Sequence, residues 1–121
     1  MFTKTLYVQV RENQFQIRNI DDSRSLQRHA TPAFSSQGKL VDNFAAAAKC
    51  LKAALSEARG SGFVLSTRVV IHPIEKIDGG LTQVEERLFL ELAVFAGATK
   101  VIVWVGAQLS DAEVMEKIKG K

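Results

Sequence analysis

The stretch Thr5-Leu-Tyr-Val-Gln-Val-Arg-Glu-Asn-Gln-Phe-Gln-Ile-Arg18 decides the fold class of this chain. Apolar and polar residues alternate along it, apart from a break at residues 11–13. The apolar residues of one face are Leu6, Val8, Val10, Phe15 and Ile17. A period of two predicts β-strands, so this stretch predicts two strands joined by a short hairpin turn. A third, weaker strand is expected over residues 25–29, after a turn signal at residues 21–23.

From residue 40 the period lengthens to three or four, which is typical of an amphipathic helix. This first helix is expected to end at the glycines around residue 60. Two short apolar runs downstream predict buried, parallel strands, and the segments after them predict two more helices. The expected strands cover residues 69–71 and 101–105, and the expected helices cover residues 82–96 and 110–119.

The elements therefore follow the order βββ-α-β-α-β-α, and residues 1–121 form a single α/β domain. An antiparallel meander followed by alternating helices and strands predicts a mixed sheet with helices against its faces. The residues between 30 and 38 form a loop, because proline, serine and glycine are frequent there.

Composition excludes several classes of protein. Of 121 residues, 46% are hydrophobic and 24% charged, as in ordinary globular domains and unlike disordered chains. The net charge of +3 is small and scattered, and basic residues are not interleaved with aromatic ones, so no nucleic-acid partner is expected. The single cysteine, Cys50, cannot form an internal disulfide. With no targeting or membrane segment expected, the sequence predicts a cytoplasmic protein without membrane insertion.

The segment Thr82-Gln83-Val84-Glu85 fits the pattern of a helix capping box. In that interpretation Thr82 and Glu85 satisfy each other's backbone amides at the start of the helix. The alternative is that Glu85 orients an attacking water at the helix N-terminus. Capping is the favoured interpretation, because the pattern is common at helix starts.

The helix that follows is apolar on more than one face. Its residues Phe89, Ala93 and Ala96 fall at positions i, i+4 and i+7. They are expected either to be buried against the sheet or to contact a second chain, and burial is favoured. A buried face predicts a monomer, and an exposed face predicts a weak homodimer.

Gly79 and Gly80 lie between an expected strand and an expected helix, where backbone amides can bind an anion. The signal for a cofactor here is weak, because the surrounding residues fit neither of the common glycine-rich phosphate-binding motifs. Neither histidine has a cysteine or carboxylate at metal-ligand spacing. The sequence therefore predicts no cofactor and no metal.

The second half of the chain resembles the bacterial actin homologue MreB family. The resemblance rests on Arg68-Val-Val-Ile-His-Pro73, Thr82-Gln-Val-Glu-Glu-Arg87, Ala96-Gly-Ala-Thr-Lys-Val101 and Gly38-Lys-Leu-Val-Asp-Asn-Phe44. It implies the actin/Hsp70/ribonuclease H-like fold, and within it the actin-like ATPase subdomain IA. The small IB subdomain and the second large domain of that family have no counterpart in this chain. Asp42 and Glu85 match the family's conserved Asp and its water-positioning Glu.

The first phosphate loop of the family, roughly I-D-L-G-T, corresponds here to Val8-Gln-Val-Arg-Glu12. The metal-organising Asp is replaced by Gln9, and the Gly that admits phosphate is replaced by Arg11. Glu12 adds a negative charge where a triphosphate would lie. Asp42 and Glu85 are therefore expected to be remnants without a catalytic role.

The resemblance and these departures predict a non-catalytic MreB-like protein that acts by protein–protein contact in cell-shape or cytoskeletal regulation. Its partner would be a full-length actin-like filament protein. A nucleotide-binding regulator without hydrolysis is one alternative. A ribonuclease H-like nuclease is a second, which the first strand disfavours because it carries no acidic residue to hold metal ions.

Overall fold

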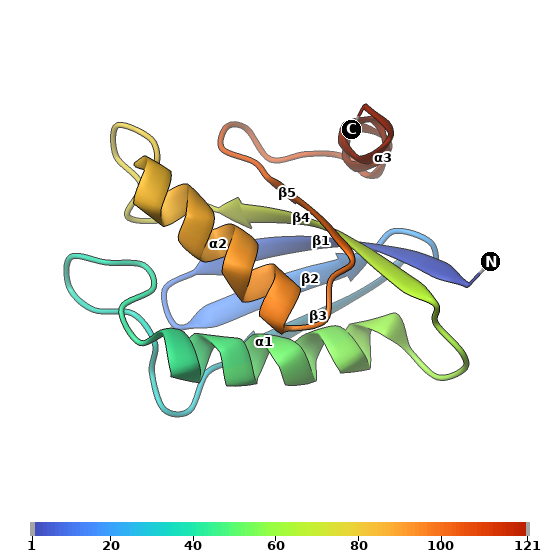
Figure 1. Cartoon of the computed structure of the whole chain (residues 1–121), viewed down its shortest axis with the longest axis horizontal. Coiled ribbons are helices and arrows are strands. Elements are labelled where there is room, and N and C mark those ends of the chain that lie inside the picture. The colour runs from blue at the N-terminus through green and yellow to red at the C-terminus, as the bar shows by residue number, and fades with distance from the viewer. Residues whose placement is uncertain (1, 121) are drawn as a thin grey trace.

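The computed structural model describes residues 2–120 as a five-stranded sheet with three helices (Figure 1). The strands are β1 (Thr3–Arg11), β2 (Gln14–Asn19), β3 (Arg24–His29), β4 (Ser66–Pro73) and β5 (Lys100–Val103). The helices are α1 (Phe44–Arg59), α2 (Gln83–Phe95) and α3 (Asp111–Lys119). The α/β class and the mixed sheet are thus as predicted.

The strands lie in the order β3-β2-β1-β4-β5. β1 pairs antiparallel with β2 and parallel with β4, while β2 pairs antiparallel with β3, and β4 pairs parallel with β5. The central position of β1 explains its burial, because it has a hydrogen-bonded neighbour on each side and core residues on its face.

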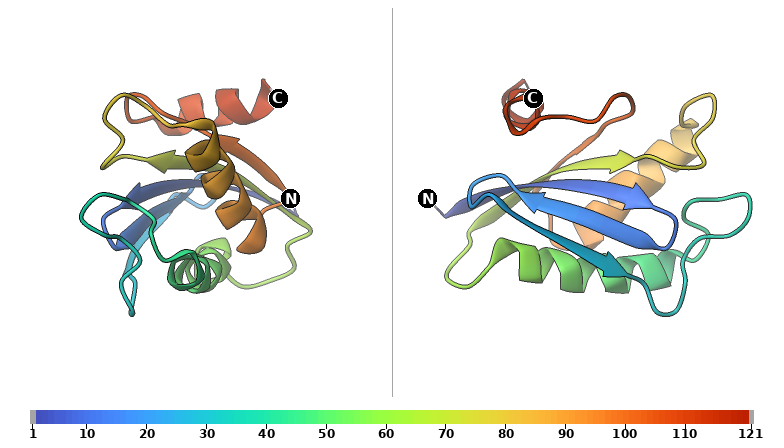
Figure 2. Two further views of the ribbon diagram at one scale, coloured as in Figure 1. Left: turned by 60° about the vertical axis from the view of Figure 1, so that its left-hand side comes forward. Right: turned by 180° about the vertical axis from the view of Figure 1, so that it is seen from behind.

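The main core lies between the sheet and the two longer helices. Leu6, Val8 and Val10 of β1 pack there with the apolar faces of α1 and α2. Figure 2 shows both helices on one side of the sheet and α3 on the other. Because α1 contacts β2 and β3 while α2 contacts β4 and β5, the two helices share this face between them.

A smaller core lies on the opposite face, under α3. It joins Tyr7 and Val70 of the sheet to Val114 and Ile118 of α3 and to Leu109 just before it. This helix contacts β4. In the rear view of Figure 2, β1, β2 and β3 lie in front of α2, and no helix is drawn over their outer side. That outer side is where polar side chains collect.

Several element boundaries differ from the prediction; the strand expected over residues 69–71, for example, extends over Ser66–Pro73 as β4. The first helix begins at Phe44 rather than at residue 40, because the Asn43 side chain accepts a hydrogen bond from the Ala46 amide and caps it. Leu40 and Val41 are buried in the preceding loop instead. The last strand ends at Val103, after which the Trp104 amide still donates to the Ile71 carbonyl before the chain turns away.

Candidate binding site

The outer face of β1–β3 carries rows of polar side chains from three strands. Backbone register places Gln9 beside Gln16, and Gln16 beside Gln27. The next row along the strands joins Tyr7, Arg18 and Ser25. We call these six residues the amide face. Because side chains alternate in direction along a strand, the apolar core residues between them point to the opposite face.

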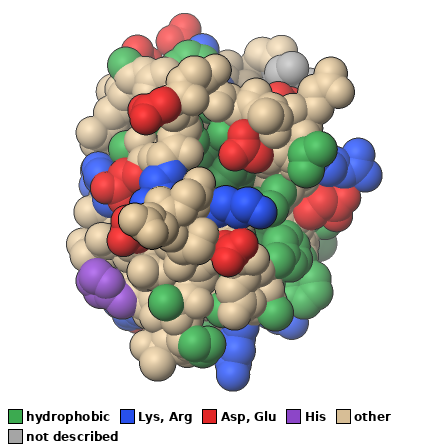
Figure 3. All heavy atoms as spheres, turned by 90° about the vertical axis from the view of Figure 1, so that its left-hand side faces the viewer, with side chains coloured by type: hydrophobic (Ala, Val, Ile, Leu, Met, Phe, Trp, Pro, Cys, Tyr) green, Lys and Arg blue, Asp and Glu red, His purple; other side chains and the backbone are tan. Residues whose placement is uncertain are grey.

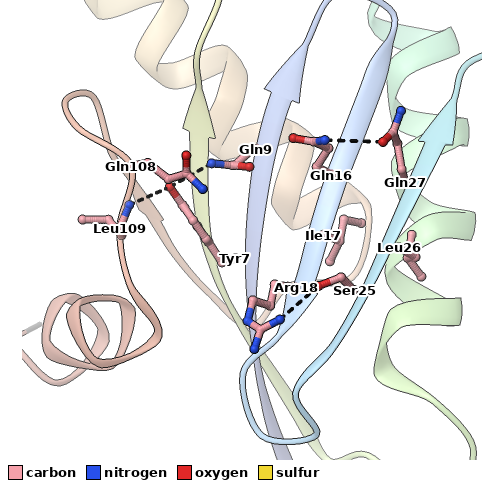
Figure 4. A pocket seen from close by; sticks show the side chains of 10 residues that line it. All are labelled: Tyr7, Gln9, Gln16, Ile17, Arg18, Ser25, Leu26, Gln27, Gln108 and Leu109. Atoms are coloured by element: carbon pink, nitrogen blue, oxygen red, sulfur yellow. Dashed lines mark hydrogen bonds between the residues drawn. The ribbon is translucent and has the colours of Figure 1, made fainter.

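A pocket of about 500 Å³ lies over the amide face (Figure 4). Gln108 and Leu109, from the segment between β5 and α3, form its remaining wall together with the side chains of the three strands. Several groups that line it can both donate and accept hydrogen bonds, as primary amides do. Its chemistry is therefore that of a neutral polar binding site with one guanidinium at its edge.

Two glutamines of the amide face, Gln16 and Gln27, are held by neighbouring side chains of the same sheet. Arg11 Nε donates to Gln16 Oε1 at 2.9 Å, and Gln27 Nε2 donates to Gln14 Oε1 at 2.6 Å. Gln16 Nε2 and Gln27 Oε1 lie 3.4 Å apart, which is a weak contact. These bonds hold the long side chains in place, which lowers the entropy lost when a ligand is bound.

The side chain of Arg18 is held at the edge of the pocket by hydrogen bonds to two neighbours. Its Nε donates to Asp111 Oδ1 at 2.8 Å, and its Nη1 donates to the Ser25 hydroxyl at 3.1 Å. The hydrogen bond to Asp111 raises the pKa of Arg18 further above its usual value. The ion pair also links the start of α3 to β2 and offsets much of the charge of the pocket edge.

Beneath the pocket, a hydrogen-bond network is built on Tyr7 and His72, which are both almost fully buried. Tyr7 Oη lies 2.7 Å from His72 Nδ1, and His72 Nε2 lies 3.0 Å from the Gly106 carbonyl oxygen. The Leu109 amide donates to Tyr7 Oη at 3.1 Å, and Gln9 Nε2 donates to it at 3.3 Å. The network thus fixes the loop of residues 106–109 against the sheet.

Burial lowers the pKa of His72 from its ordinary value, although the hydrogen bond to the Gly106 carbonyl opposes the shift. The Arg11 charge adds to the lowering. His72 is therefore neutral at pH 7. Sequence alone gave it no role, because neither Tyr7 nor Gly106 is near it along the chain.

The segment Val8 to Glu12, which resembles the phosphate loop of the MreB family, is contacted at its end by side chains that follow β4. The Glu12 amide donates to the Glu75 carboxylate at 2.5 Å, and Glu12 forms an ion pair with Lys76 at 3.3 Å. In Figure 3, which faces the end of the molecule where the β1–β2 turn lies, acidic and basic side chains are intermingled. The backbone amide of Glu12 thus already donates a hydrogen bond to a carboxylate.

The two family-matched carboxylates lie outside the pocket. Thr82 and Glu85 form the capping box that the sequence predicted: the Thr82 amide donates to Glu85 Oε1 at 2.9 Å, and the Glu85 amide donates to Thr82 Oγ1 at 3.1 Å. Asp42 is exposed, and Lys39 lies 3.9 Å from its carboxylate. Gly79 and Gly80 are in an exposed turn, where the Gly80 amide already donates to the Ile77 carbonyl.

The interface hypothesis for Phe89, Ala93 and Ala96 needs correction. All three are buried in the main core of the chain itself, at 3%, 0% and 2% exposure. The apolar residues that α2 exposes are Val84, Val94 and Phe95. The favoured expectation, burial against the sheet, is the one that the structure shows.

The sequence reading missed the pocket residues Gln16, Gln27 and Gln108. A signal was present, since polar residues recur every second position in all three leading strands. That signal becomes a site only when the register aligns the strands. In residues 2–120 the structure places no three His, Cys, Asp or Glu side chains together as metal ligands, and no helix there is both long and apolar enough to cross a membrane.

No protein-family model matches the chain. It is similar to a protein of Escherichia coli strain K12 that bears the name "Uncharacterized protein YjaA". The two sequences are 36% identical, and the match covers 96% of this chain and 98% of that protein.

Proposed function

The chain belongs to the same family as the Escherichia coli protein YjaA, and we propose that it is a non-catalytic, MreB-like protein that acts through protein–protein contact. In this proposal the chain corresponds to an actin-like subdomain IA of ribonuclease H-like fold. It works in the cytoplasm on a full-length actin-like filament protein, in cell-shape or cytoskeletal regulation.

The arrangement of the strands supports the fold part of this proposal. Three antiparallel strands are followed by two that lie parallel to β1, in the order β3-β2-β1-β4-β5. The resemblance implies, for a subdomain IA, a three-stranded meander that continues α-β-α-β, and the elements of this chain follow that order. The Thr82-Gln-Val-Glu85 motif lies at the first turn of α2, where the same resemblance expects it.

One observation carries the non-catalytic part: the amide of Glu12 is bound by the carboxylate of Glu75. Phosphate-binding loops present free backbone amides and admit close approach of the anion. Here the amide is already satisfied, and two carboxylates lie where a triphosphate would have to enter. Like charges repel, so both hydrolysis and tight nucleotide binding are disfavoured.

The nuclease alternative lacks its ligands. Two-metal catalysis needs clustered carboxylates to hold the ions. The hydrogen-bonded side chains that β1 and β4 bring together on the outer face include those of Tyr7, Gln9 and His72, and, farther along the strands, Thr5 and Arg68. An amide and a phenol are poor substitutes for a carboxylate as ligands of Mg²⁺, which prefers charged oxygens and water.

The amide face is the surface that we propose for the partner. Primary amides donate and accept at once, so they can pair with the backbone or side chains of another protein without a buried charge. Charged pairs at interfaces often gain little net affinity, whereas neutral hydrogen-bonding groups specify register at lower desolvation cost. The pocket also gives the partner a concave place to insert a side chain.

The experiment is co-sedimentation with a purified, full-length actin-like filament protein. Wild-type protein should pellet with filaments, and the double variant Gln16→Ala/Gln27→Ala should pellet at least tenfold less. The control is Gln37→Ala, which changes an exposed glutamine of the loop before α1. Equal pelleting of the double variant would exclude the amide face, and no pelleting of the wild type would exclude the filament partner.

A further inference from the structure

The hydrogen-bond network under the pocket has only one consistent assignment of protons when His72 is neutral. The Gly106 carbonyl can only accept, so His72 Nε2 carries the hydrogen. His72 Nδ1 then has a lone pair, and the Tyr7 hydroxyl must donate to it at 2.7 Å. Tyr7 Oη consequently accepts from the other two neighbours, the Leu109 amide and Gln9 Nε2.

This assignment fixes which end of the Gln9 side chain faces the pocket. Because Gln9 Nε2 donates to Tyr7, the carbonyl oxygen Oε1 points away from it, across the sheet on the side of Gln16 (Figure 4). Gln9 is 7% exposed and lines the pocket. Within residues 2–120, Gln9 Oε1 accepts no hydrogen bond. With neutral His72, the pocket floor therefore presents an acceptor that lacks a donor.

Protonation of His72 reverses the direction of its hydrogen bond with Tyr7. Nδ1 becomes a donor aimed at Tyr7 Oη, and the phenolic hydrogen loses its acceptor. With the Leu109 amide also donating, Tyr7 Oη has two donors for its two lone pairs and no room for a third from Gln9. A half-turn of the Gln9 amide solves this, because Oε1 then accepts the phenolic hydrogen. The bond that must break is the longest of those to Tyr7, at 3.3 Å.

We propose that His72, Tyr7 and Gln9 form a proton-operated relay that inverts the hydrogen-bonding polarity of the pocket floor. With neutral His72, Gln9 offers its oxygen and selects a ligand group that donates, such as an amide N–H or a hydroxyl. With protonated His72, Gln9 offers its amide hydrogens and selects a group that accepts, such as a carbonyl or carboxylate oxygen.

The charges around His72 determine the pH range over which His72 is protonated and the relay changes state. Arg11 on β1 is a cation that acts against protonation. Trp104 contacts the imidazole edge-on at 6.5 Å, and the ammonium of Lys117 from α3 lies 4.1 Å from the centre of that indole ring. No ion pair among residues 2–120 includes His72, so no carboxylate is in direct contact with a charge there. The relay therefore responds to acid, below the ordinary pKa of histidine.

The relay is a property of the free chain, and only its effect on binding rests on the proposed function. The test is therefore NMR of the ¹⁵N-labelled protein without a partner. At pH 7.5 the imidazole of His72 should show the Nε2–H tautomer. On acidification, the side-chain NH₂ resonances of Gln9 should shift with the same midpoint as the ring of His72. An Nδ1–H tautomer, or Gln9 resonances that stay fixed through the titration of His72, would overturn the proposal.

Variants of Gln9 give a second, independent readout. Gln9→Met cannot accept the phenolic hydrogen, so the midpoint of His72 should fall below that of the wild type. Gln9→Glu accepts and adds a negative charge, so the midpoint should rise. Gln27→Met, on the same face but with no bond to Tyr7, should leave it unchanged. Equal midpoints in all four proteins would contradict the relay, whatever the outcome of co-sedimentation.

Discussion

The carboxylate of Glu75 binds the backbone amide of Glu12 at 2.5 Å, although the two residues are 63 positions apart in the chain. The bond joins the segment after β4 to the turn between β1 and β2, which is the position that the proposed MreB-like relationship would assign to phosphate. Glu12 is visible in the sequence, but its contact with Glu75 exists only in the folded chain. The first prediction follows from this contact.

The protein should have no ATPase activity above buffer, because the segment that the proposed relationship assigns to phosphate contains Arg11 and Glu12 and is bound by Glu75. A phosphate-release assay with ATP and magnesium checks the activity. A titration with the same nucleotide, followed by backbone amide shifts, checks for binding without turnover. Magnesium-dependent turnover that disappears in Glu85→Ala would restore the catalytic interpretation.

Glu85→Ala should lower the free energy of unfolding by about 0.5–2 kcal/mol, because it removes half of the capping box at the start of α2. Denaturant unfolding measures the change. Glu86→Ala is the matched control, since Glu86 lies in the same first turn but makes no capping bond, and it should cost only a few tenths of a kcal/mol. Equal costs in the two variants would contradict the capping role.

Phe89→Asp should unfold the protein, whereas Phe95→Asp should leave it folded. Phe89 is 3% exposed in the main core, and removal of such a ring alone costs about 3–5 kcal/mol before a buried charge is added. Phe95 is 61% exposed on the same helix. Circular dichroism and light scattering test both variants. A wild type that is a monomer or weak dimer, and a Phe95→Asp variant of unchanged or smaller size, are the expected results.

Stability should fall as the pH is lowered from about 7.5 to 5.5. The pKa of His72 is lower in the folded protein than the ordinary 6.5, so the unfolded chain binds more protons over that range and is favoured by acid. Urea unfolding at the two pH values measures the loss. The variant His72→Gln should reduce the change in unfolding free energy between the two pH values. The variant His29→Gln, at an exposed histidine, should leave that change as in the wild type. An unchanged slope in His72→Gln would contradict the assignment.

The thiol of Cys50 should react slowly with maleimides at pH 7. Burial raises the pKa of this half-buried thiol, although the charge of Arg28 opposes the shift, and the thiolate is the reactive form. The reaction should accelerate to the rate of a free thiol in urea. A rate equal to that of glutathione in the folded protein would contradict this assignment.

The sequence by itself determined the elements and their order, because those signals are local. Alternation over residues 5–18 reports which side of a strand is buried, and a capping pattern such as Thr82 to Glu85 involves neighbours only. Both features were confirmed by the structure. The same local signals could not decide which apolar residues of α2 face the sheet, because this helix is apolar on more than one face. In the structure Phe89, Leu92 and Ala93 are buried, whereas Phe95 is exposed.

Only the tertiary structure decided the pocket and the buried network. Gln9, Gln16 and Gln27 come from three strands, and it is the register of the sheet that places them in one row. Tyr7 and His72, which are 65 positions apart in the chain, meet because β1 and β4 pair in parallel. A hydrogen bond is effective over about 3 Å, so its partners depend on which strands are neighbours and on their register. The positions of the residues along the chain reveal neither the neighbouring strands nor the register.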